Sequence, residues 1–402
     1  MSGPFSDVSK TIFDDKTVLT ESYQPEEILE RDEEIEEYRY ALQDVLFGSE
    51  PDNVFLYGKA GLGKTAVTKY MTDSLVEEAN KREEADDVHV QEINCNGKSL
   101  FTIVRSLVNN LLPSTASPFP KRGLGTADAF EELYRQLDRI GGSHLMVFDE
   151  IDHLDDADTL LYELPRARSN GHITKSRIGV IGISNNYTFR KRLSSKVKDT
   201  LMETEISFTP YDANELMTIL QHRADQAFVD GACDRSAIAK AAALSAQDRG
   251  NARQAIDLLR AGAEVAQKED EETVIDNHVE AARTLVQRGR LQTRIREQTD
   301  HSQYILETIA KLDEKGETPS RSKQIHKEYE RVADAYASTP LTTLKSIQDH
   351  LSQLHTLGFL VRYEHNQGRS GGIYYEYELD LNPEIVLETR IEIGRPSSDG
   401  SA

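Results

Sequence analysis

Cysteine, tryptophan and long apolar runs are scarce or missing in this 402-residue sequence, and these absences exclude several classes of protein. Tryptophan is absent, and Cys95 and Cys233 are too few for a disulfide framework or a four-cysteine zinc site. No run approaches the roughly 18 apolar residues of a membrane span, and the N-terminus lacks the basic and apolar segments of a secretory signal. We therefore expect a cytoplasmic protein without a membrane partner.

Basic residues are also in deficit: 47 Lys and Arg stand against 69 Asp and Glu, a formal net charge of -22. Such an acidic balance normally argues against a nucleic-acid partner, because the protein's field repels phosphate. Here the excess of acid is spread along the whole chain, which is typical of a halophilic surface. The composition therefore predicts a protein that loses structure in low salt.

The clearest motif lies between a short apolar run, Val54 to Tyr57, and a helix-forming stretch that resumes at Thr65. It has the P-loop spacing G-x-x-x-x-G-K-T, whose glycines let backbone N–H groups wrap a triphosphate. Lys64 would reach the β- and γ-phosphates, and the Thr65 hydroxyl would bind Mg²⁺. The expected ATP-binding residues here are Gly58, Lys59, Ala60, Gly61, Leu62, Gly63, Lys64, Thr65 and Ala66.

A second nucleotide-site motif follows at 144–150, where an apolar strand runs into two carboxylates. Asp149 would complete the Mg²⁺ shell, and Glu150 would orient and deprotonate the attacking water. Another continuously apolar strand, 178–184, ends at Asn185, an amide placed to bond the γ-phosphate. A strand-end asparagine is also a common turn residue, but this context favours the nucleotide role.

Alternating strands and helices with buried strands predict a parallel, doubly wound sheet that binds its ligand at the carboxyl ends of the strands. A helix over 24–48 precedes the P-loop. Arg31, a lone cation in an acidic turn of this helix, is predicted to form a solvated pair with a nearby glutamate. Downstream, Asp212 and Glu215 form a capping box that opens a small all-α domain, and Gly250-Asn251 interrupts its helices before Arg253.

The last part of the chain reads as three helices and a hairpin with a glycine-rich tip, 365–372, which together predict a winged helix-turn-helix. Such domains bind either DNA or protein. The DNA-contacting candidates are Lys345 and Gln348 on the third helix, Arg362 on the strand before the wing, and Arg369 in the wing. A long loop over 113–126 carries two more, Lys121 and Arg122, although it also fits a solvated loop tip.

These motifs in this order resemble the archaeal origin-recognition and cell-division-control initiator family of AAA+ ATPases, from about Tyr23 to Leu387. The matching segments are YQPEEILERDEEIEE, YGKAGLGKT, VFDEID, GISNN, EISFTPY and GNARQAIDLL. The resemblance implies an AAA+ domain at 21–210, a helical lid at 211–296 and a winged helix at 297–392. Residues 1–20 and 393–402 are expected to be flexible tails.

By this resemblance Asn185 and Arg253 sense the γ-phosphate, and Tyr211 and Arg223 line the nucleotide site from the domain junction. The family binds ATP or ADP with Mg²⁺, binds double-stranded origin DNA, recruits an MCM-type replicative helicase and can self-associate on DNA. The insertion near Lys121 touches DNA in the family. A nucleoid-associated initiator is therefore expected.

One departure concerns Lys196, which stands where the family typically has an arginine. Lysine lacks the planar guanidinium fork, so stimulation of hydrolysis between subunits is in doubt and turnover should be slow. Two alternatives stay open. The first is a paralogue that regulates transcription or repair, and the second is a clamp-loader or remodelling ATPase whose winged helix binds protein.

Overall fold

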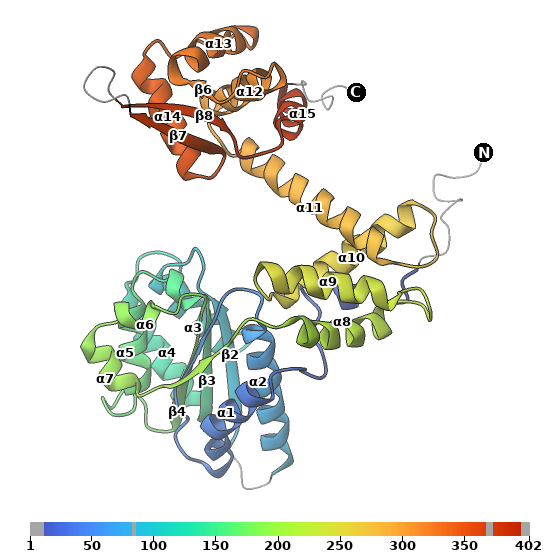
Figure 1. The fold of residues 1–402 in the computed structure, drawn as a ribbon. Helices are drawn as coiled ribbons and strands as arrows, with labels where there is room; N and C mark the ends of the chain where they lie inside the picture. The colour runs from blue at the N-terminus through green and yellow to red at the C-terminus, as the bar shows by residue number, and fades with distance from the viewer. Residues whose placement is uncertain (1–11, 83–85, 367–372, 395–402) are drawn as a thin grey trace, which may run out of the picture. The chain divides into compact units, whose positions relative to one another are not determined.

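The computed structural model describes residues 12–82, 86–366 and 373–394. The chain divides into two compact units, residues 1–281 and 282–402, which are treated separately below (Figure 1). Within the described ranges, none of the helices combines the length and apolar character that crossing a bilayer requires.

The first unit is built on a five-stranded parallel sheet in the order β2-β3-β4-β1-β5. The strand that leads to the P-loop, β1, therefore lies between two strands that come later in the chain, as a doubly wound sheet requires. The predicted fold class is confirmed. The strands are β1 Val54–Tyr57, β2 Val88–Asn94, β3 Gly142–Asp149, β4 Ser176–Ser184 and β5 Thr204–Ser207.

Helices cover both faces of this sheet (Figure 1). Alternation along β1 shows why: Val54 and Leu56 join the core on one face, whereas Phe55 and Tyr57 join the core on the other. The first core includes α1 (Asp32–Leu42) and α2 (Lys64–Lys81). The second includes α3 (Leu100–Leu111), α4 (Thr126–Ile140), α5 (Ala157–Arg166) and α7 (Ser195–Leu201); the short α6 (Phe189–Arg192) precedes α7.

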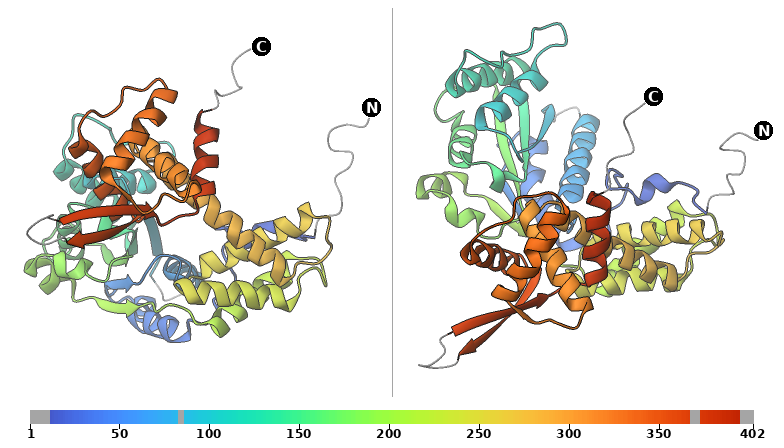
Figure 2. Two further views of the ribbon diagram at one scale, coloured as in Figure 1. Left: turned by 45° about the horizontal axis from the view of Figure 1, so that its top comes forward. Right: turned by 90° about the horizontal axis from the view of Figure 1, so that it is seen from above.

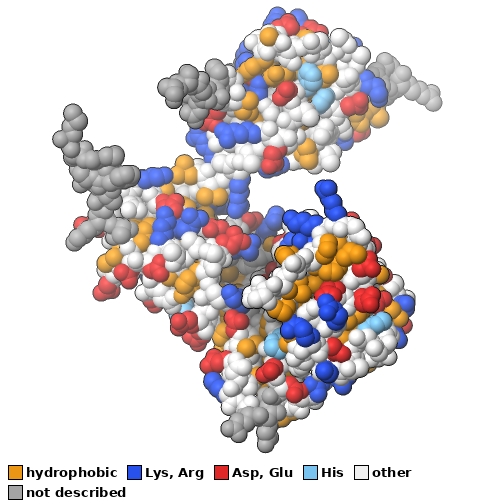
Figure 3. Space-filling view, turned by 180° about the vertical axis from the view of Figure 1, so that it is seen from behind, with side chains coloured by type: hydrophobic (Ala, Val, Ile, Leu, Met, Phe, Trp, Pro, Cys, Tyr) orange, Lys and Arg blue, Asp and Glu red, His pale blue; other side chains and the backbone are white. Residues whose placement is uncertain are grey.

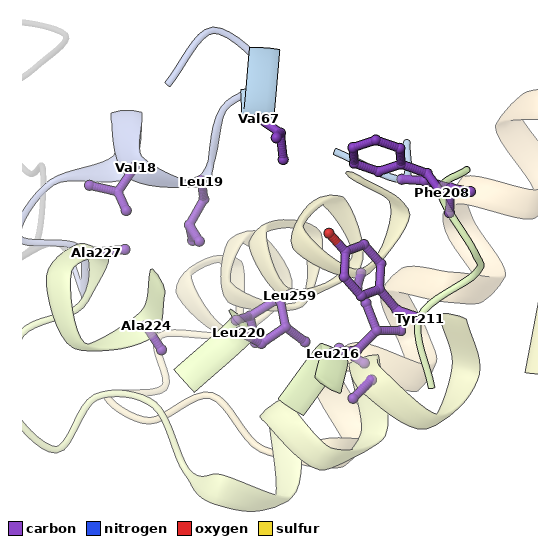
Figure 4. Close-up of a cluster of buried hydrophobic side chains, with 14 of the residues drawn as sticks. Val18, Leu19, Val67, Phe208, Tyr211, Leu216, Leu220, Ala224, Ala227 and Leu259 are labelled. Carbon is purple, nitrogen blue, oxygen red and sulfur yellow. The ribbon is translucent and has the colours of Figure 1, made fainter. Parts of the chain in front are cut away.

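Three helices follow the sheet and form the lid: α8 (Ala213–Ala227), α9 (Arg235–Asp248) and α10 (Ala252–Lys268). The predicted capping box is present, because the Asp212 carboxylate accepts from the Glu215 N–H and Glu215 accepts from the Asp212 N–H. Figure 4 shows lid leucines gathered beside Phe208 and Tyr211, which lie on the chain between β5 and α8. The lid thus shares one apolar core with the sheet's first face.

The N-terminal segment 12–20 was predicted to be a flexible tail, and for these residues that prediction is wrong. Phe13 stacks on Phe228 with 5.3 Å between ring centroids, and the Asp14 N–H donates to the Ala227 carbonyl at 2.9 Å. Ile12, Phe13, Val18 and Leu19 are buried against the lid, and the 3-10 helix η1 (Lys16–Leu19) lies among them. Four apolar residues among polar ones are too few to show a periodic pattern.

The helix predicted over 24–48 is shorter than expected. It begins at Asp32, where three acidic residues in the first turn favour the positive end of the helix dipole, and Glu30 before it has a φ of 59°. It ends at Leu42 and continues as the 3-10 helix η2 (Gln43–Phe47), which stops at Gly48 in a left-handed conformation. The stretch 24–30 is therefore not helical, and it can contact other parts of the unit.

The second unit is the predicted winged helix-turn-helix. It contains α12 (Asp300–Glu314), α13 (Ser322–Ala335), α14 (Leu344–Thr356) and an antiparallel sheet of β6 (Ser320–Arg321), β8 (Ile373–Leu379) and β7 (Leu360–Asn366). The β7–β8 hairpin projects from the helices of its unit (Figure 2). The long helix α11 (Asp276–Arg296) connects the two units along the chain.

A further helix, α15 (Pro383–Gly394), was not predicted from the sequence. It packs on α12 through buried Val386, and its buried Arg390 donates to the Glu307 carboxylate at 3.1 Å. A basic residue on the inward face broke the apolar pattern by which the helix could have been recognised.

Acidic and basic side chains are interspersed over the described part of the surface that Figure 3 draws, so the acidic excess is not gathered in one patch of that face. Because self-repulsion among like charges destabilises a compact state and salt screens it, the melting temperature should rise from dilute buffer to molar KCl. A circular-dichroism melt measures this directly. A protein at least as stable in dilute buffer as in molar KCl would contradict the halophilic interpretation.

Candidate functional site

The P-loop connects β1 to the N-terminus of α2, so it lies at the carboxyl edge of the sheet. Gly61 and Gly63 have φ angles of 80° and 92°, in the left-handed region that favours glycine. A Cβ on Gly61 would also collide with the amide of Asn251, the N-cap of α10. The glycines therefore allow the loop to fold tightly and the lid to approach it.

Lys64 is buried at the first turn of α2 and donates three hydrogen bonds. Its Nζ lies 2.7 Å from the Gly58 carbonyl, 2.8 Å from the Lys59 carbonyl and 2.9 Å from Asn185 Oδ1. Burial lowers the pKa of Lys64 to about 8, while the nearby Asp149 opposes this change. The structure thus brings together the P-loop lysine and the asparagine at the end of β4.

The two residues predicted to hold Mg²⁺ also meet. Thr65 Oγ1 donates to Asp149 Oδ2 at 2.9 Å, and the Glu150 N–H donates to Asp149 Oδ1 at 2.8 Å. Burial raises the pKa of Asp149, whereas these two hydrogen bonds act to lower it. A hydroxyl and one carboxylate are oxygen ligands that suit Mg²⁺, which usually takes its remaining ligands from water and substrate phosphates. These residues fit the ion.

A cavity of about 460 Å³ opens between the P-loop, the lid and the stretch 20–29. Gly58, Lys59 and Leu62 do not line it. Their backbone carbonyls accept hydrogen bonds from Lys64 or Arg31. The predicted residues that do line it are Ala60, Gly61, Gly63, Lys64, Thr65, Ala66, Asp149, Glu150, Asn185, Tyr211, Arg223 and Arg253. Twelve positions spread from 60 to 253 thus surround one nucleotide-sized space.

The stretch 20–29 contributes to this cavity, although none of the predicted site residues comes from it. Residues 20–25 line it, together with Asn94 at the end of β2. The Gln24 amide donates to the Ala66 carbonyl at 3.4 Å, which ties the segment to the start of α2. The YQPEEILERDEEIEE match is the signal in the sequence, since by that resemblance the residues on either side of Arg31 are similar to the family's adenine-side linker.

The two lid arginines that were predicted as site residues both contact the stretch 20–25. Arg253 pairs with Glu21 at 3.0 Å, and the Arg223 guanidinium lies 4.5 Å from the Tyr23 ring centroid. Arg223 also donates to the Val18 carbonyl at 3.4 Å. Each arginine therefore lines the cavity and has a partner in the stretch 20–25.

The lid touches the P-loop backbone itself through the residues that open α10. The Asn251 amide donates to the Ala60 carbonyl, and the Ala252 N–H donates to the Gly61 carbonyl, both at 3.1 Å. Asn251 was not among the predicted site residues, although GNARQ in the sequence is its signal. A change in the position of α10 would therefore shift the carbonyls of Ala60 and Gly61 in the loop that would hold the phosphates.

Arg31 was predicted to be solvated, and that prediction is wrong. Its side chain is 3% exposed, although it does form the expected kind of pair, with Glu34 at 2.8 Å. Its other N–H groups donate to residues far away in the sequence, and a local sequence pattern cannot reveal such contacts.

Lys196, which replaces the arginine typical of the family pattern, lies on α7 with its Nζ 3.6 Å from the Tyr162 ring centroid. This cation–π contact places its charge against an aromatic face. Lys196 lies outside the residues that line the cavity of its own chain.

The candidate DNA contacts lie in the winged helix and in the loop between α3 and α4. On α14, Lys345 and Gln348 are exposed, whereas Ile347, Leu351 and Leu354 face the core. Arg362 on β7 is exposed, with its guanidinium 4.6 Å from the Tyr375 ring centroid. Arg369 lies outside the described residues.

Lys121 and Arg122 are exposed in the loop between α3 and α4. Phe119 anchors this loop, since its N–H donates to Asn109 Oδ1 at 2.7 Å and its carbonyl accepts from Arg105 Nε at 3.0 Å. The two cations therefore follow closely after a residue whose backbone is bonded to two side chains of α3.

Comparison with known proteins shows similarity along nearly the whole chain. Three family models match: an AAA domain over residues 49–193, the Cdc6 AAA+ ATPase-type lid domain over 217–284, and the CDC6 C-terminal winged helix domain over 293–389. The ORC1-type DNA replication protein 8 of Halobacterium salinarum is 49% identical over 389 residues, which cover 96% of this chain and 98% of that protein.

A more distant relative, the ORC1-type DNA replication protein of Thermococcus kodakarensis, is 33% identical over 381 residues, covering 94% of this chain and 90% of that protein. Among solved structures, the Aeropyrum pernix ORC1 protein in complex with DNA matches with a TM-score of 0.74 and 29% identity. That match covers 96% of this chain and 98% of the other.

Proposed function

This chain belongs to the Orc1/Cdc6 family of AAA+ DNA replication proteins, and we propose that it is an initiator that uses ATP as a switch when it binds origin DNA. One observation carries the nucleotide part of this proposal. The P-loop Lys64 bonds Asn185 while Thr65 bonds Asp149, and all four line one cavity with the lid. The DNA part rests on the winged helix and on the likeness of the whole chain to an ORC1 protein in complex with DNA.

In this proposal the chain's own groups divide the work of hydrolysis. Lys64 and the P-loop N–H groups bind the phosphates, and Asn185 and Arg253 hold the γ-phosphate. Glu150 accepts the proton of the attacking water, from a position held by the N–H bond to Asp149. Bound Mg²⁺, held by Thr65 and Asp149, would neutralise the charge on the β- and γ-oxygens.

Slow turnover follows from the missing arginine. Lys196 offers a point charge rather than a planar fork to a neighbouring subunit, and its Nζ lies against Tyr162 in this chain. ATP would therefore persist long enough to act as a switch, with Arg253 and the lid reporting whether the γ-phosphate is present.

We further propose that residues 21–210, 211–296 and 297–392 act as the nucleotide domain, lid and DNA-binding domain, with the N-terminal segment 12–20 added to the lid. The winged helix and the Lys121–Arg122 loop would bind double-stranded origin DNA in the cytoplasm, at the nucleoid. The DNA-bound form would self-associate and recruit an MCM-type helicase. The family membership supports these partners.

Binding to DNA can be tested at the exposed face of α14. Gln348→Ala should weaken binding to a specific site by about 1–3 kcal/mol, because glutamine can bond a base edge in the major groove. Fluorescence anisotropy in molar KCl measures this. Gln221→Ala is the matched control, since Gln221 is exposed on α8 and bonds Asp225 of its own helix.

Lys345→Ala should act differently in the same assay. A phosphate contact carries no sequence information, so the variant should weaken binding to all sequences and lower the slope of log K against log salt by about 1. Equal affinities of both variants and the wild type would show that α14 does not enter the groove, and would favour a winged helix that binds protein.

A further inference from the structure

We propose that Arg31 is a positioning residue that couples the P-loop to the chain leading into the lid, so that phosphate occupancy and lid position change together. The inference rests on the nucleotide switch proposed above and names the side chain through which that switch acts. Arg31 lies outside the residues that line the cavity, so it acts through others and not on the nucleotide.

The guanidinium of Arg31 divides its donors among three segments. Nη1 donates to Glu34 on α1, at 2.8 Å. Nη2 donates both to the Leu62 carbonyl at 3.3 Å and to the Thr209 carbonyl at 2.8 Å, and Nε donates to the Tyr211 hydroxyl at 2.9 Å. A single nitrogen atom thus joins the P-loop backbone to the chain between β5 and α8.

The two backbone partners lie at positions where a small shift matters. Leu62 lies between Gly61 and Gly63, whose left-handed conformations shape the loop. Thr209 and Tyr211 lie in the short stretch between β5 and α8, the first lid helix. The Tyr211 ring also stacks on the guanidinium at 3.7 Å from its centroid, and Tyr211 lines the cavity. A rotation of α8 would therefore move Thr209 and Tyr211, and through Arg31 it would displace the Leu62 carbonyl in the P-loop.

Pairing with a glutamate does not require this arrangement, as Arg39 on α1 shows. Arg39 pairs with Glu36 at the same three-residue spacing as Arg31 with Glu34, and its guanidinium lies over Tyr40. Its side chain is about half exposed, however, and its bonds go to residues of its own helix and the next turn. Burial of Arg31 between the P-loop and the lid connection is what distinguishes the two.

Arg31→Lys tests the coupling in the full chain, because lysine keeps the charge but lacks the planar fork that reaches two carbonyls and a hydroxyl at once. Hydrogen exchange of residues 208–228 is measured with a slowly hydrolysed ATP analogue and with ADP, in molar KCl. The wild type should show different exchange in the two states. In Arg31→Lys this difference should shrink about fivefold or more, while Arg39→Lys should behave as the wild type.

Tyr211→Phe, which removes one acceptor and keeps the ring, provides a second variant in case Arg31→Lys does not fold. It should reduce the same difference in exchange. If Arg31→Lys and Tyr211→Phe melt at a lower temperature yet keep the full wild-type difference between nucleotides, Arg31 serves stability alone and the inference is overturned. If the wild type itself responds equally to both nucleotides, the proposed switch fails, and the coupling fails with it.

Discussion

Replacing Lys64 with alanine is expected to abolish binding of both ATP and ADP. The Lys64 ammonium is the buried cation of the P-loop, held 2.9 Å from Asn185 Oδ1 and by two carbonyls at the start of the loop. Truncating one partner of a buried, hydrogen-bonded charge pair costs about 2–5 kcal/mol, which corresponds to a loss of roughly 30-fold to several thousand-fold in affinity.

Isothermal titration calorimetry in molar KCl measures this loss. Lys69→Ala is the matched control, because Lys69 is an exposed lysine one turn and a half further along α2. Tight retention of ATP by Lys64→Ala would refute the assignment of residues 58–65 as the phosphate-binding loop. The melting temperatures of both variants show whether any loss comes from unfolding.

The second large effect concerns the chemical step. Glu150→Gln should bind ATP as the wild type does and lose hydrolysis by about 10²- to 10⁴-fold, since the amide keeps the shape of the side chain but cannot accept a proton. The position is well defined: Glu150 follows β3 directly, with a φ of 54°, and its N–H bonds Asp149.

Phosphate release under single-turnover conditions separates this chemical step from binding. Asp155→Asn is a suitable control, because Asp155 is an exposed acid five residues further along the chain. Unchanged turnover in Glu150→Gln would remove Glu150 from the role of general base. A variant that also lost ATP affinity would point instead to a role in holding the nucleotide.

Much of the fold and part of the site could be predicted because their signals are local. Lys64 and Thr65 follow from the spacing of one loop, whereas Asp149 ends one apolar strand and Asn185 directly follows another. Parallel strands then bring their carboxyl ends together, so the meeting of Thr65 with Asp149 and of Lys64 with Asn185 could be expected from the fold class.

The other features depend on contacts between distant positions. Arg31 bonds residues 178 and 180 positions away, and those partners decide that it is buried. The segment around Phe13 has too few apolar residues for a pattern and is ordered by its packing on α8. Similarly, α15 buries a paired Arg390, which a pattern of apolar residues cannot reveal.

Footprinting of the ATP-loaded protein, in molar KCl, on a library of fragments from its own genome tests the central claim most directly. An origin-binding initiator should protect repeated elements in one or a few intergenic regions, and Gln348→Ala should weaken that protection. Protection at many promoters would contradict the initiator and favour a regulator. Absence of protection would contradict DNA recognition and favour a remodelling ATPase with protein clients.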